Sequence, residues 1–260
     1  MAKERYIIIT PVRDEEQYIE KTIMSVISQT IRPIEWIIVD DGSTDNTGSI
    51  IDKYADQHGW IKTIHRSNRG HREAGGGVIE AFYDGYNCVE SKDWDFIVKL
   101  DGDLSFDSDY FERCFHNFHY SPRLGISGGG IYHIIAGQTK FEKDPVFHVR
   151  GATKIYRRPC WDAIGSLLKA PGWDTLDEVK ANMLGWDTRS FPELKLVHHR
   201  PTGTADGTWR NWVKNGMANY VSYHPLFMLF KCVKRLFQKP YILVSIALLA
   251  SFIFLFTLFL

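Results

Sequence analysis

Two clusters of carboxylates follow apolar runs in the first half of the chain. Asp101 and Asp103 flank a glycine directly after the run 96–100, and Asp40 and Asp41 follow an earlier run. Carboxylates on alternate residues suit a hard divalent cation such as Mg²⁺ or Mn²⁺, which prefers oxygen ligands. A cation of this kind can hold a diphosphate. The pattern therefore favours chemistry on a nucleotide-activated substrate.

These acids must be positioned by the elements around them. Apolar runs alternate with segments of helical periodicity, which is typical of an α/β protein with a mostly parallel sheet flanked by helices. The expected strands span 6–10, 34–40, 60–65 and 96–100, with a short strand or turn at 125–130. The expected helices span 15–28, 47–58, 78–88, 107–118 and 174–184. Ligands of open α/β sheets bind at the carboxyl ends of the strands, so both acidic clusters are expected at one binding edge.

Composition narrows the class of protein. Lysine plus arginine equals aspartate plus glutamate, at 31 each, so no net field draws the chain toward nucleic acid. The four cysteines lack CxxC spacing, which fits a reducing compartment and gives neither a disulfide framework nor a zinc site. The simplest division is one catalytic domain over 1–225 followed by a membrane-associated segment over 226–260.

The C-terminal segment carries a membrane signal. Residues 241–260 contain no charged side chain. As a helix of about 1.5 Å per residue they would span roughly 30 Å, the hydrocarbon thickness of a bilayer. Basic and apolar residues interleave over 229–239, which is typical of an amphipathic helix on the cytoplasmic membrane surface. The sequence therefore predicts a single-pass transmembrane protein of the cell membrane with its catalytic domain in the cytoplasm.

Three motifs in order resemble the family-two glycosyltransferases, which have the GT-A (Rossmann-like) fold. They are TPVRDE at 10–15, DDGSTD at 40–45 and DGD at 101–103, and the resemblance covers most of residues 5–200. It implies an inverting, metal-dependent transferase that takes a sugar from a UDP-, GDP- or dTDP-linked donor. The DGD sequence matches the metal-binding DxD motif of the family.

The resemblance implies that the first two motifs bind the nucleotide of the donor. A carboxylate of Asp40 or Asp41 could accept the imino hydrogen of a uracil or guanine base. The alternative is that Asp41 and Asp45 only cap the helix that follows. The predicted donor-binding residues are Thr10, Pro11, Arg13, Glu15, Asp40, Asp41, Arg69, Arg72, Asp101 and Arg200.

The metal ligands are also implied by the resemblance. Asp103 is the expected principal ligand, and Asp101 is expected on the ribose or on a metal-bound water. Some GT-A enzymes add a histidine, and His199 is the predicted ligand here, with His198 as the alternative. Adjacent residues of a strand point to opposite faces, so at most one of the two histidines can contact the metal. Lys99 is expected to point away from the site.

Direct displacement at the anomeric carbon needs a carboxylate that deprotonates the acceptor hydroxyl. Asp174, Asp177 and Glu178 fall at i, i+3 and i+4, so they share one face of a helix that begins here. Family members often carry Glu-Asp with the aspartate eleven residues before a glycine. Counting back from Gly185 reaches Asp174, with Trp173 in place of the glutamate. Asp174 is therefore ranked before Asp177 as the base. The alternative is that these acids have no catalytic role and only stabilise the N-terminus of the helix through its dipole.

The predicted acceptor is a lipid-linked or other saccharide associated with the membrane, used in surface polysaccharide synthesis. Tethering raises the effective concentration of an acceptor confined to the bilayer. A polyprenyl-phosphate glycosyl synthase is the close alternative, and its phosphate acceptor hardly needs a base. A nucleotidyltransferase is more distant, because the loop after the run 6–10 has no glycine.

Overall fold

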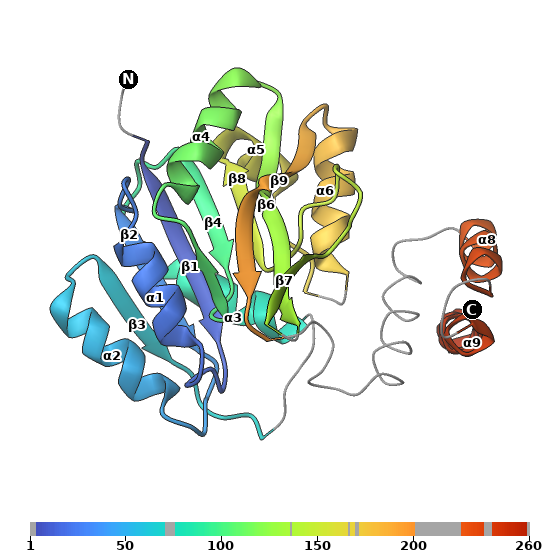
Figure 1. Ribbon diagram of the computed structural model, residues 1–260, viewed down its shortest axis with the longest axis horizontal. Helices are drawn as coiled ribbons and strands as arrows, with labels where there is room; N and C mark the ends of the chain where they lie inside the picture. The colour runs from blue at the N-terminus through green and yellow to red at the C-terminus, as the bar shows by residue number, and fades with distance from the viewer. Residues whose placement is uncertain are drawn as a thin grey trace.

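The structure is a computed structural model of the 260-residue chain, and it describes residues 4–70, 76–135, 137–165, 167–169, 172–200, 225–236 and 241–258. Within these residues nine strands form one sheet, with helices on both faces (Figure 1). The strands are β1 Tyr6–Val12, β2 Glu35–Asp40, β3 Ile61–His65, β4 Phe96–Leu100, β5 Leu104–Phe106, β6 Leu124–Ile135, β7 Gln138–Phe141, β8 Thr153–Arg157 and β9 Asp187–His198. The helices are α1 Ile19–Ile27, α2 Thr47–Gln57, α3 Gly76–Asn87, α4 Tyr110–Tyr120, α5 Arg158–Ile164, α6 Trp173–Met183, α8 Pro225–Leu236 and α9 Tyr241–Leu258.

The sheet has a parallel half and a mixed half. Its strand order is β3-β2-β1-β4-β8-β6-β9-β5, and β7 pairs with β6. The neighbours among β3, β2, β1 and β4 are parallel, so the carboxyl ends of these strands lie on one edge. The strand β8 is antiparallel to both β4 and β6, whereas β6 and β9 are parallel. The expected parallel sheet is thus confirmed in the first half, and the second half is mixed.

Alternating side chains of β1 enter two hydrophobic cores. Tyr6 and Ile8 lie in the core beneath α1, α2 and α4, and Ile7 and Ile9 lie in the core beneath α3, α5 and α6. This alternation follows from the period of two in a strand, and β-branched isoleucine fits a sheet buried on both faces. Because helices cover both faces, the loops at the carboxyl edge are left for a binding site.

The first helix begins later than the periodicity predicts. The structure starts α1 at Ile19, because residues before it are used in the loop that follows β1. Asp14 has a positive φ of 53°, which turns the chain. The backbone N–H of Glu15 donates to Thr47 Oγ1 at 2.8 Å, so it is tied to the start of α2. Tertiary contacts therefore override helix propensity over residues 15–18.

The strand β9 was not predicted, although it brings the last site residues into place. Its burial pattern alternates only in part, and its register with β6 shifts between Gly129 and Gly130, opposite Pro192. A proline and a bulge break the period-two signal on which strand prediction depends. The strand β5 pairs Leu104 with His198, a connection between residues far apart in sequence.

The helices α8 and α9 pack against each other (Figure 1). Their shared core consists of Met228, Cys232, Leu248 and Phe252. Among the described residues no helix has the length and apolar character needed to cross a membrane. The predicted transmembrane helix over 241–260 is therefore not found.

Candidate active site

The carboxyl ends of β1 and β2 bring Arg13 and Asp41 together. Arg13 Nη1 donates to the main-chain oxygen of Asp41 at 3.1 Å. The Asp41 carboxylate is held by the guanidinium groups of Arg66 and Arg69, the latter at 2.6 Å. Arg69 also pairs with Glu80 of α3 at 3.0 Å. The carboxylate is thus fixed in place, and it retains lone pairs with which a base N–H could bond.

Asp40, one residue earlier, builds the turn. Its Oδ1 accepts the backbone N–H of Ser43 at 2.8 Å, and its Oδ2 lies 3.2 Å from His65 Nδ1. Asp45 accepts the backbone N–H of Thr47 at 3.0 Å, at the start of α2. Asp45 thus bonds the first residue of α2, although the N-cap residue of this helix is Asn46 and makes no side-chain capping bond. Of the two adjacent aspartates, Asp41 lies among the arginines.

Two predicted donor contacts lie within the buried strand β1. The Thr10 Oγ1 accepts a hydrogen bond from Trp36 Nε1 at 2.9 Å in the core, so its side chain does not point to the open edge. Pro11 pairs with Val39 in the sheet and is buried. Arg72, a third predicted contact, lies outside the described residues.

Asp101 and Asp103 lie directly after β4, as predicted. A Cβ at Gly102 would stand 2.6 Å from Val12 Cγ1, so only glycine lets the turn pack against β1. Asp103 is 6% exposed, and its Oδ2 lies 3.0 Å from His198 Nε2. Burial would raise the pKa of Asp103, but the hydrogen bond and charge of His198 outweigh it and hold this pKa below its usual range. Asp103 is therefore a carboxylate in the folded protein.

The prediction that Lys99 points away from the site is wrong, because its ammonium group pairs with the Asp101 carboxylate. It also donates to the main-chain oxygen of Gly151 at 2.6 Å and lies 5.4 Å from the centre of the Trp173 ring. Residues 99 and 101 are two apart, so they share one face of the extended chain. Burial raises the pKa of Asp101 despite this lysine.

Arg200 joins the first loop to the acidic pair. Its Nη2 donates to Glu15 Oε2 at 2.6 Å and to the main-chain oxygen of Asp14 at 3.1 Å. Its Nε lies 4.0 Å from Asp103 Oδ2. The loop that follows β1 and the acidic pair therefore meet at one edge of the sheet. Arg200 and Glu15, both predicted donor-binding residues, lie between them.

The two histidines point in opposite directions, as strand geometry predicts. His198 contacts Asp103, whereas His199 Nε2 lies 2.8 Å from Ser105 Oγ. The ring of His199 stacks on Tyr18 at 6.1 Å. The backbone N–H of His199 donates to the main-chain oxygen of Asp103 at 2.9 Å, but its imidazole is directed to Ser105, and the imidazole beside the predicted metal ligands is that of His198.

Two of the three acids predicted for the base lie in a buried network. Lys154 Nζ lies 2.7 Å and 2.9 Å from the two carboxylate oxygens of Asp177 and 3.0 Å from Glu178 Oε1. Tyr156 donates its hydroxyl hydrogen to Asp177 at 2.6 Å. Burial raises the pKa of Asp177, although Lys154 opposes this. Asp174 is half-buried and is the acid of the three that remains partly accessible.

Sequence reasoning missed Lys154 and Tyr156, which hold this network. They alternate along β8, and a period-two pattern on a strand was the signal that could have placed them on one face. The Trp173 ring lies between two ammonium groups, 5.4 Å from that of Lys99 and 5.6 Å from that of Lys154. Trp173 therefore connects the acidic pair to the helix that carries Asp174.

The acidic pair offers carboxylate oxygens to a divalent cation. Within the described ranges, no group of three or more His, Cys, Asp and Glu side chains is arranged to hold a metal ion. The Oδ1 atom of Asp103 is nevertheless buried and has no hydrogen-bond partner among the described residues. An oxygen of this kind fits a Mg²⁺ or Mn²⁺ that is bound by one or two carboxylates together with water and substrate phosphate.

Comparison with known proteins identifies the family to which this fold and site belong. Residues 7–167, more than half of the chain, match the family described as Glycosyl transferase family 2. The chain belongs to this family. The matched residues include β1 to β8 and the acidic pair, whereas α6 and β9 lie beyond them.

Curated relatives match part of the chain. The uncharacterized glycosyltransferase EpsJ of Bacillus subtilis (strain 168) is 34% identical over 125 residues, which are 48% of this chain and 33% of EpsJ. Poly-beta-1,6-N-acetyl-D-glucosamine synthase of Staphylococcus aureus (strain COL) is 31% identical over 117 residues, 45% of this chain and 26% of that protein. The matches thus span a third or less of these relatives.

Solved structures share the fold at low sequence identity. The mannosyltransferase PcManGT from Pyrobaculum calidifontis, in complex with GDP-Man and Mn²⁺, has a TM-score of 0.64 and 15% identity, covering 99% of this chain and 75% of that one. S. aureus TarS 1–349 in complex with UDP-GlcNAc has a TM-score of 0.60 and 17% identity, covering 96% and 71%. These likenesses show that the chain has a GT-A-like fold.

Proposed function

We propose that this chain is a metal-dependent, inverting glycosyltransferase. It moves a sugar from a nucleotide diphosphate donor to a membrane-associated acceptor, a lipid-linked saccharide of surface polysaccharide synthesis. Membership of glycosyl transferase family 2 supports the reaction class. One fold relative is in complex with UDP-GlcNAc and another with GDP-Man and Mn²⁺, which supports donors of these kinds.

One observation carries the proposal: the nucleotide loops and the acidic pair form a single site. Arg200 contacts Glu15 and approaches Asp103, so a donor bound at Asp41 through its base could extend its diphosphate toward the DxD motif. Arg13 and Arg200 are cations on this path, and guanidinium groups bind phosphate oxygens as bidentate donors. The geometry thus suits a nucleotide at one end and a leaving diphosphate at the other.

In this proposal Asp103 and Asp101 would hold Mg²⁺ or Mn²⁺, and such a cation would supply positive charge to the leaving diphosphate. Asp174 accepts the proton of the acceptor hydroxyl, and the acceptor oxygen then forms a bond to the anomeric carbon. The bond from that carbon to the phosphate oxygen breaks from the opposite side, which inverts the configuration. Lys154 holds the first turn of α6 through the main-chain oxygen of Asp174, so it positions the base.

We further infer that the chain works at the cytoplasmic face of the cell membrane. The helix α8 exposes large apolar side chains, such as Phe230 at 70% and Leu226 at 61%. Its last turn carries Lys234 and Arg235. An amphipathic helix with these two kinds of residues binds at the interface of an anionic bilayer. This location would keep the enzyme beside a lipid-linked acceptor.

Thermal-shift measurements with UDP-, GDP- and dTDP-sugars, with and without Mn²⁺, test the proposed reaction class. We expect one nucleotide class to stabilise the full chain only when metal is present. Asp103→Ala should abolish this stabilisation, whereas Asp162→Ala, which removes a carboxylate 63% exposed on α5, should preserve it. Equal stabilisation in Asp103→Ala and wild type would remove the metal assignment.

The configuration of the product tests inversion separately. Proton NMR of the first product formed should show the anomeric configuration opposite to that of the donor. Asp174→Asn should lower kcat with little change in the donor KM, because the carboxylate acts on the acceptor. Retained configuration would contradict the displacement mechanism.

A further inference from the structure

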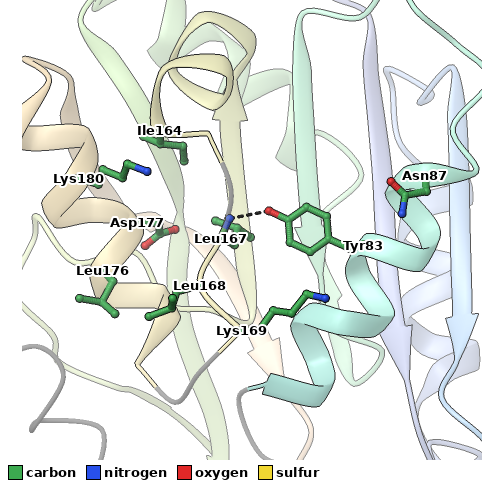
Figure 2. A pocket seen from close by; sticks show the side chains of 9 residues that line it. All are labelled: Tyr83, Asn87, Ile164, Leu167, Leu168, Lys169, Leu176, Asp177 and Lys180. Atoms are coloured by element: carbon green, nitrogen blue, oxygen red, sulfur yellow. Dashed lines mark hydrogen bonds between the residues drawn. The ribbon is translucent and has the colours of Figure 1, made fainter.

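A cavity of about 870 Å³ lies between α3, α6 and the loop that follows α5 (Figure 2). Its lining includes the ring of Tyr83 and the aliphatic side chains of Ile164, Leu167, Leu168 and Leu176. Pockets for small molecules have volumes of roughly 300–1,000 Å³ and are mainly apolar. The cavity therefore has the size and the lining to hold an apolar chain of a ligand.

Two hydrogen bonds connect the walls of the cavity. The Tyr83 hydroxyl accepts the backbone N–H of Leu167, so α3 holds the loop in place (Figure 2). Trp161 Nε1 donates to the Tyr86 hydroxyl at 3.2 Å, which ties α5 to the same helix.

Among the charged residues of the cavity, the acid is paired with a cation and the two lysines are not paired with an acid in the described part of the chain. Asp177 is 5% exposed, and Lys154 and Tyr156 bind its carboxylate from the interior. Lys169 and Lys180 are exposed, and neither has an ion-pair partner among the residues that the structure describes. The uncompensated charge of the cavity is therefore positive, and it lies beside an apolar lining.

We propose that this cavity binds a lipid phosphate, with the isoprenoid or alkyl chain against the leucines and the phosphate at Lys169 or at Lys180, which lie apart, one in the loop beside α3 and the other on α6 (Figure 2). The inference rests on the proposed function and names the carrier of the acceptor. The helix α6 supplies both Leu176 of the cavity and Asp174, so a carrier bound here would lie beside the helix that bears the base. Where the structure describes the residues assigned to the donor, neither lysine has a hydrogen bond or ion pair with one of them.

Photolabelling of the full chain tests this site directly. Farnesyl phosphate carrying a benzophenone group, used below its micellar concentration, should label peptides within residues 164–180. Mapping is essential because α8 and α9 also expose apolar side chains. Labelling confined to those two helices would overturn the proposal.

Variants that remove the lysine charges test how much the phosphate group contributes to binding of farnesyl phosphate. Lys169→Gln combined with Lys180→Gln should weaken farnesyl phosphate binding about tenfold, the effect of losing charge-assisted bonds. Lys53→Gln on α2, a lysine 61% exposed, is the matched control and should bind as wild type does. Both cavity lysines are exposed, so the double variant should fold. Unchanged binding in the double variant would overturn the proposal.

Two further probes separate the chain from the phosphate. Farnesol and inorganic phosphate should each bind at least about tenfold more weakly than farnesyl phosphate, and equal binding of either would overturn the proposal. Donor stabilisation with Mn²⁺ should persist in the double lysine variant. If Asp103→Ala leaves the donor effect unchanged, the proposed function fails, whereas the photolabelling result decides the lipid site.

Discussion

Replacing Lys154 with methionine removes the only cation that contacts Asp177 within the described residues. The side chains of Lys154, Asp177 and Glu178 are 0%, 1% and 5% exposed. Glu178 keeps other partners, since Val149 donates its backbone N–H at 2.7 Å. Breaking a buried ion pair by removing one partner costs about 3–5 kcal/mol, because the remaining charge is left uncompensated. We expect Lys154→Met to lose this amount of unfolding free energy at pH 7.5.

A second substitution should restore much of that loss. In Lys154→Met with Asp177→Asn the uncompensated charge of Asp177 is gone and Glu178 keeps its other partners, so the double variant should be more stable than Lys154→Met by about 2 kcal/mol. The single variant should also recover as the pH falls. The folded-state pKa of Asp177 is already raised above 3.8 by burial, and loss of Lys154 raises it further. Protonation of the folded state therefore relieves the cost as the pH falls through that raised pKa toward 3.8.

Urea denaturation followed by tryptophan fluorescence at pH 7.5 and pH 5 measures these differences. Lys53→Met on the surface is the control, and an exposed pair contributes at most about 1 kcal/mol. A loss below about 1 kcal/mol in Lys154→Met, or a double variant no more stable than Lys154→Met, would refute this account of the buried network.

Three other changes test separate contacts. Gly102→Ala would place a methyl group 2.6 Å from a β1 side chain, so it should cost about 1–3 kcal/mol in urea and remove the Mn²⁺-dependent donor shift. His148→Gln should be destabilising below pH 6.5 and neutral once the pH exceeds the folded-state pKa, because Glu178 raises the pKa of His148 against the effect of burial. Denaturation at pH 6 and pH 8.5 checks this, and an equal loss at both would contradict it. Thr10→Val leaves the indole of Trp36 without its acceptor and should cost about 1–3 kcal/mol, with unchanged donor binding.

The sequence predicted best where one strong local signal was sufficient. Apolar runs located β1, β2 and β4, and the acids that follow two of them are at a common edge. Parallel pairing alone places Asp41 and Asp103 on that edge, so no knowledge of distant contacts was needed. The family resemblance rested on the same motifs, and the family match confirms it.

Prediction failed where a partner distant in sequence decides the outcome. His199 and His198 both fitted the sequence pattern, and only the pairing of β5 with β9 turns the His198 side chain toward Asp103. Lys154 had no acidic neighbour in sequence, yet it compensates Asp177 across 23 residues. The error at Lys99 was different, since counting the strand period would have corrected it.

The late position of β9 in the chain has a consequence for biosynthesis. During synthesis the DxD turn emerges nearly 100 residues before the strand that carries His198 and ends beside Arg200. Until this strand inserts between β6 and β5, the carboxylate of Asp103 lacks both of these cationic neighbours. A nascent chain in that state would have the loops that follow β1 and β2, but His198 and Arg200 would not yet lie beside Asp103. Catalytic competence would thus appear late and abruptly, when the sheet is completed.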